Sequence, residues 1–148
     1  MKLRPILQYP DALIESCFKL LINEKLVNPV IKILLNKVNV HDTSAVLRVI
    51  EYLNLILKSF TSRRRSLPIS FNYSFLFKGL RIILQSEFAM GVSCALSLIY
   101  NHFQLFHLEF RRSLSLYLLG AAFYRLYLHW SHTVRHVFYH LITFKVYA

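Results

Sequence analysis

Apolar side chains recur at spacings of three and four residues along nearly the whole chain, and this periodicity constrains the fold more than any other feature. Between residues 46 and 60, for example, such positions form one stripe along an α-helix. These positions are Val46, Val49, Ile50, Leu53, Leu57 and Phe60. Only three glycines and four prolines interrupt the 148 residues, and strand-like alternation is absent over useful lengths. The sequence therefore predicts an all-α fold.

The periodicity and the candidate caps divide the chain into about seven helices. Asn28 is expected to cap the second helix, with Pro29 in its first turn. The sixth helix is apolar on most sides, which is typical of a central helix. The expected ranges, caps included, are 11–24, 28–38, 42–60, 73–85, 88–106, 108–129 and 131–148.

Short connections between these helices favour antiparallel helical hairpins, packed either as a bundle or as a short repeat-like stack. At this length we expect one domain. Its parts are N-terminal helical hairpins (1–60), a basic linker (61–72) and a C-terminal helical core (73–148).

The chain is strongly basic, with 18 Lys and Arg against seven Asp and Glu and a formal net charge of +11. No carboxylate follows Glu109. Such a balance favours an anionic partner, which could be an acidic protein, a membrane surface or a nucleic acid. The aromatic residues fall at core spacing and form no RNA-binding motif, so a nucleic acid is the least supported of the three.

Residues 88–108 form a run of 21 residues without formal charge, close to the length of a membrane span. Polar residues crowd its second half, at Asn101, His102, Gln104 and His107. A buried helix is therefore favoured, and a membrane-embedded or peripheral segment is the alternative.

We expect Cys17 and Cys94 to be small buried apolar residues. The sequence shows no disulfide framework and no apolar signal-peptide segment near the start. These features favour an intracellular, cytoplasmic protein.

The stretch HWSHTVRHVFYH, residues 129–140, holds four of the seven histidines. His132, His136 and His140 follow one another at i, i+4 and i+8, on the helix side opposite the apolar residues. The outer two are about 12 Å apart along the axis, so one zinc ion cannot join all three. We therefore expect no metal site, and interpret these histidines with Arg135 as a docking face for an acidic partner. A pH-sensitive patch is the alternative.

His129, Trp130 and Ser131 are expected to form a structural corner between the last two helices. A histidine at a helix C-terminus interacts favourably with the exposed carbonyl groups. Trp130 is the only tryptophan and is expected to be wedged between the helices, while Ser131 caps the last helix.

The linker contains RRRSL, residues 63–67, in which Ser66 is a candidate phosphorylation site for a basophilic kinase. A solvated basic loop is the favoured interpretation of this stretch, and phosphorylation of Ser66 is the alternative. The sequence has no Gly-rich phosphate loop, no G-x-S-x-G and no H-E-x-x-H. We therefore expect no catalytic residues, no cofactor and no enzymatic activity.

Residues 46–146 resemble a fungal domain-of-unknown-function family, DUF1765, whose members carry a membrane-protein label. The resemblance is most specific at YNHFQLF, residues 100–106, followed by FYRLYLHWSHTVRHVF, residues 123–138. The family has no assigned catalytic residues, so the resemblance implies none here. We expect a non-catalytic helical interaction or scaffold module, with a small membrane-embedded or peripheral protein as the alternative.

Overall fold

The structure, a computed structural model, describes residues 16, 24–36, 38–39, 41–62 and 66–147. Within these ranges the regular structure is helical, without strands, so the predicted all-α fold is confirmed. Cys17, nearly all of the expected helix 11–24 and the arginines at 63–65 lie outside the described residues.

The regular elements follow one another with short connections. They are α2 (Glu24–Asn36), α3 (Thr43–Ser62), α4 (Tyr73–Leu84), α5 (Ala89–His102), the 3₁₀ turn η2 (Phe103–Leu105), α6 (Leu108–Leu119), α7 (Phe123–Tyr127), α8 (His132–Leu141) and the π-helix η3 (Ile142–Val146).

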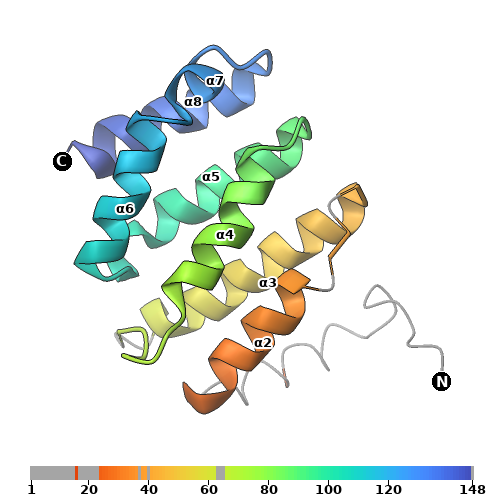
Figure 1. The fold of residues 1–148 in the computed structure, drawn as a ribbon, viewed down its shortest axis with the longest axis vertical. Coiled ribbons are helices and arrows are strands. Elements are labelled where there is room, and N and C mark those ends of the chain that lie inside the picture. The colour runs from red at the N-terminus through yellow and green to blue at the C-terminus, as the bar shows by residue number, and fades with distance from the viewer. Residues whose placement is uncertain (1–15, 17–23, 37, 40, 63–65, 148) are drawn as a thin grey trace.

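The helices form two layers, and successive long helices run in opposite directions (Figure 1). One layer contains α2, α4 and α6, and the other contains α3, α5 and α8. Side-by-side contacts join α3 to α5 and α5 to α8, while α4 packs on α5 and α2 packs on α4. This is the stack of antiparallel hairpins, with α2 at one end and the α6–α8 hairpin at the other.

The core centres on α5, which contacts helices of both layers. Its sequence AMGVSCALSLIYNH is short and rich in small side chains, so neighbouring helices approach it closely from several sides. The buried positions of α5 are Gly91, Val92, Ser93, Ala95, Leu96, Leu98, Ile99 and His102. The predicted stripe of α3 is also confirmed, because all six of its residues are buried.

The expected single central helix at 108–129 is wrong, because the chain breaks at Gly120. That residue has φ −104° and ψ −100°, and a Cβ there would lie 2.8 Å from the carbonyl oxygen of Leu116. Only glycine fits such a close approach. The amide of Ala122 donates to Tyr117 O at 3.0 Å and closes the turn before α7. Leu116 and Leu128, placed in the core by the sequence pattern, are therefore 75% and 70% exposed.

The start of α2 also differs from the prediction, since the helix begins at Glu24 and includes Pro29. Asn28 is not its cap. Instead, the Asn28 side chain donates to Ser70 O at 2.6 Å and accepts from the Asn72 amide at 2.9 Å. Asn72 in turn caps α4 by accepting from the Phe75 amide. These bonds tie α2 to the end of the linker and fix where α4 begins.

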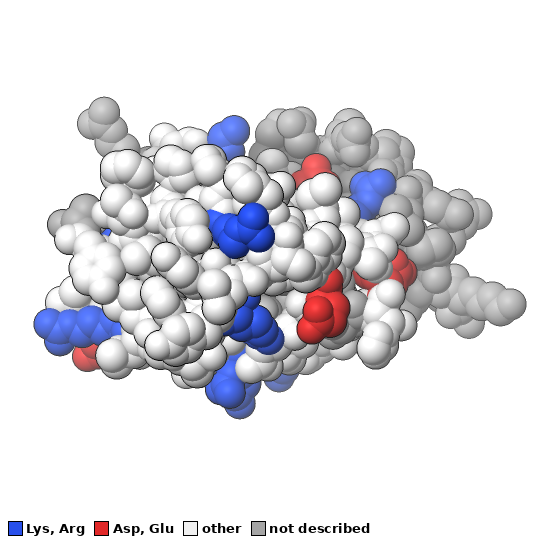
Figure 2. All heavy atoms as spheres, turned by 90° about the horizontal axis from the view of Figure 1, so that it is seen from above, with Lys and Arg blue, Asp and Glu red and all other residues white. Residues whose placement is uncertain are grey.

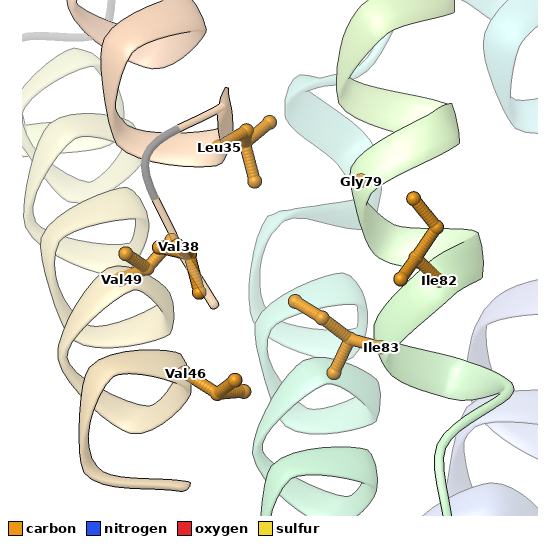
Figure 3. Close-up of a pocket in the computed structure, with 7 residues that line it drawn as sticks. All are labelled: Leu35, Val38, Val46, Val49, Gly79, Ile82 and Ile83. Atoms are coloured by element: carbon orange, nitrogen blue, oxygen red, sulfur yellow. The ribbon is translucent and has the colours of Figure 1, made fainter. Parts of the chain in front are cut away.

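A small apolar hollow of about 40 Å³ remains where α2, α3 and α4 meet (Figure 3). Its lining consists of aliphatic side chains and Gly79. A Cβ at Gly79 would lie 2.8 Å from the tip of Leu35, so this glycine lets α2 and α4 pack closely. With no polar side chain in its lining, the hollow is a packing gap and offers nothing to orient a polar ligand.

We predict different effects of alanine at two glycines. Gly120→Ala should lower the free energy of unfolding by about 1–3 kcal/mol, because the new methyl group meets a backbone oxygen. Gly79→Ala should change it by less than about 1 kcal/mol, because Leu35 can move aside and alanine favours the helix. Urea unfolding followed by circular dichroism measures both. Equal effects of the two substitutions would contradict the close-approach explanation of the break.

Candidate docking surface

The uncharged run at 88–108 does not form one long helix. The helix α5 covers 14 residues and ends at His102, which corresponds to a length of about 21 Å. In the ranges that the structure describes, no helix has both the length and the apolar character needed to cross a membrane.

The three histidines of α8 form an exposed row on the side opposite Val134 and Phe138, which are buried. The ring centroids of His132 and His136 are 6.1 Å apart, and those of His136 and His140 are 4.5 Å apart. Phe144 extends the row at 5.5 Å from His140. We call these four residues the histidine row. Across the described residues, no group of three or more His, Cys, Asp and Glu side chains could hold a metal ion.

Arg135, which was expected to join the histidines in a docking face, bonds the corner before α8. Its Nη1 donates to His129 O at 2.5 Å and to Trp130 O at 3.2 Å. The Ser131 amide donates to His129 Nδ1 at 3.0 Å, so the neutral His129 ring carries its proton on Nε2. Ser131 occupies the N-cap position, but its side chain makes no capping bond. The expected serine cap is therefore absent, and the corner is held instead by the bond from the Ser131 amide to His129 and by the bonds from Arg135 to the carbonyl oxygens of His129 and Trp130.

Trp130 does not wedge between the helices as the sequence suggested. Its side chain is 72% exposed, and its ring stacks on His129 at a centroid distance of 5.5 Å. His129 is buried, and that burial lowers its pKa; Glu87 acts in the opposite direction, while Arg125 and Arg135 add to the lowering. The corner therefore holds His129 in its neutral form.

A second buried histidine, His102, was not singled out by the sequence pattern. Its Nε2 lies 2.8 Å from Asn54 Oδ1 and bridges the C-terminal end of α5 to α3. Because a carbonyl oxygen only accepts, Nε2 is the donor in this bond. Burial lowers the pKa of His102, so this ring is also neutral at pH 7.

An open groove with a volume of about 500 Å³ lies between α6 and η3. One face of α6 forms a wall of it, with Leu108, Arg111, Arg112, Ser115, Leu116 and Leu119. These residues follow the spacing i, i+3, i+4, i+7, i+8 and i+11, which is a single side of a helix. Lys145 and Val146 of η3 form the other wall. We call this feature the α6–η3 groove.

The α6 face of the groove is separate from the face that α6 buries, which contains Phe110, Leu114 and Leu118. Leu108 is 50% exposed and Leu116 is 75% exposed. Helix α6 thus has a second stripe, made of three leucines with Arg111, Arg112 and Ser115, and the fold leaves Leu108 and Leu116 open to solvent. Sequence reasoning missed it because it read the apolar residues on all sides of 108–129 as a sign of burial.

The cations at the groove are held by neutral groups. Arg111 donates from Nη1 to Gln104 Oε1 at 2.9 Å, and Lys145 Nζ lies 4.9 Å from the centroid of the Tyr100 ring. The Arg111 Nε is buried without a hydrogen-bond partner among the described residues. Arg112 is exposed. These contacts orient the side chains of Arg111 and Lys145 without cancelling their charge.

Lys and Arg side chains are spread over the end of the molecule seen in Figure 2, mostly among uncharged residues, and do not gather into one continuous tract. Ser66 is exposed in the loop before α4.

We predict that stability depends on pH through the buried histidines. Burial lowers the folded-state pKa values of both rings below 6.5, the ordinary value for histidine, so the unfolded chain binds more protons as pH falls through this region. The free energy of unfolding should therefore decrease from about pH 7.5 to about pH 5. His102→Gln keeps a donor for Asn54 but does not titrate, so it should make this dependence shallower.

Urea unfolding at several pH values measures the slope, and His41→Gln at an exposed position controls for the substitution itself. A slope unchanged by His102→Gln would contradict the assignment.

Residues 27–146, well over half of the chain, match a family described as protein of unknown function (DUF1765). Neither the curated proteins nor the solved structures contain a significant match. The matched region runs from α2 through η3 and includes the buried histidines, the histidine row and the α6–η3 groove. The chain belongs to the DUF1765 family.

Proposed function

We propose that this chain is a non-catalytic helical docking module that binds an acidic protein partner. One observation carries the proposal: cations of the C-terminal helices bond to neutral oxygens. The hydrogen bonds described for Arg111, Arg125 and Arg135 end on amide or backbone oxygens. No Asp or Glu follows Glu109 in the sequence, so an acidic partner would add negative charge to a region of the chain that carries mostly cations.

The two-layer stack supports the same function, because hairpin stacks present extended surfaces on a rigid frame. The free thiol of Cys94 is compatible with a reducing compartment, and we propose that the module works in the cytoplasm.

A peripheral membrane protein is the second candidate. It is favoured by the exposed side chains of Tyr124, Leu128 and Trp130 at the α7–α8 corner, close to Arg125. Tyrosine and tryptophan are suited to a membrane–water interface because their rings are apolar and their polar tips reach water. The grouping of these exposed side chains with Arg125 is the observation that favours a peripheral membrane protein.

We predict that the purified chain binds an acidic peptide in a salt-dependent way. A fluorescein-labelled peptide rich in glutamate should bind at low salt, and its affinity should fall roughly tenfold between about 50 and 300 mM salt. Fluorescence anisotropy measures this, with a lysine-rich peptide as the control.

Vesicles of phosphatidylcholine and phosphatidylserine, and a short DNA duplex, are the competing probes. Binding to vesicles without peptide binding would favour the membrane candidate, and a steep salt dependence on DNA alone would favour a nucleic-acid partner.

A further inference from the structure

We infer that the α6–η3 groove binds an acidic amphipathic α-helix of the partner, which lies along α6 as the next helix of the stack. This inference rests on the proposed function and assigns it a surface and a partner structure. It differs from the expectation that His132, Arg135, His136 and His140 of α8 form the docking face.

The position of the groove in the fold supports a helical occupant. In a stack of helical hairpins each hairpin is covered by its neighbours, and a terminal hairpin needs a polar outer face to remain in water. The α6–α8 hairpin ends the described stack (Figure 1), yet α6 exposes Leu108 and Leu116. These leucines lie where a further helix would pack.

The walls of the groove favour a helix over a peptide that would bind as an added β-strand. Strand addition needs main-chain hydrogen bonds to a free strand edge. Here both walls are helical elements, whose backbone groups are bonded within the helix. An occupant must satisfy its own backbone groups, and a helix does so.

The dimensions and charges of the groove specify the length and the flanking residues of the partner helix. The exposed stripe from Leu108 to Leu119 is about 16 Å long, so the partner helix needs at least three turns. Its apolar residues would pack on Leu108 and Leu116 at spacings of three and four. Carboxylates on its flanks would face Arg112 on one wall and Lys145 on the other.

Charge and shape argue against two other occupants. A second copy of this chain would bring more positive charge to an already positive groove, since the net charge is +11. A membrane surface fits a convex apolar edge better than a groove between two helical walls.

The test uses the full chain and three labelled synthetic peptides of about 18 residues, long enough for a helix of several turns. The first has leucines at helical spacing with flanking glutamates. The second has the same composition in scrambled order, and the third replaces glutamate by lysine. We expect the first to bind at least about tenfold more tightly than the second, and the third not to bind.

Substitutions then locate the site. Arg112→Glu and Leu116→Asp should each weaken binding of the first peptide about tenfold or more. Lys32→Glu on the exposed side of α2 makes the same charge change as Arg112→Glu at the other end of the stack and should have little effect. His136→Glu tests the histidine row. Should a groove variant lose its helical circular dichroism, Arg112→Gln and Lys145→Gln replace it.

Each outcome separates the inference from the proposed function. If the first peptide binds and only His136→Glu weakens it, the groove assignment fails and the docking function stands. Equal binding of the ordered and scrambled acidic peptides overturns the helical partner. If neither acidic peptide binds at low salt, both proposals fail, and vesicle binding in that case points to the membrane. Self-association of the chain through Leu116 would also overturn the inference.

Discussion

The burial of α5 between helices of both layers is the constraint on which the rest of the structure depends. A short helix of small and branched residues contacts α3, α4 and α8, and each of these neighbours must present an apolar stripe to it. The stripes of α3 and α8 are of this kind, with Leu53 and Phe138 fully buried. A polar atom on such a central helix needs a partner inside the protein, as the Nε2 of His102 finds in Asn54.

The fold was predictable where one side of a helix decides burial. The α3 stripe and the start of α4 at Tyr73 follow from the spacing of the apolar residues. The break after α6 was harder, because the clash that requires Gly120 involves a backbone oxygen one turn away. The role of Asn28 depends on Ser70 and Asn72, more than forty residues later. The periodicity of the sequence does not reveal contacts between residues that lie so far apart along the chain.

The candidate site was predicted in part. Sequence reasoning placed His132, His136 and His140 on the polar side of a helix, and the structure exposes all three. It placed Arg135 beside them without its bonds to His129 and Trp130. The α6–η3 groove was invisible because two apolar stripes on one helix look like a buried helix until the neighbours are known. The second stripe of α6 differs from a buried stripe only because no further helix of the described stack covers it.

The π-helical form of η3 changes the positions of the C-terminal side chains around the helix axis from those in an α-helix. The amide of Tyr147 bonds to Ile142 O, five residues earlier, so this turn contains about one residue more than an α-helical turn. A wheel drawn at 100° per residue therefore assigns Lys145 and Val146 to the wrong sector. Deleting one residue here would restore the α-helical period. It would also rotate the positive charge of η3 relative to the wall formed by α6.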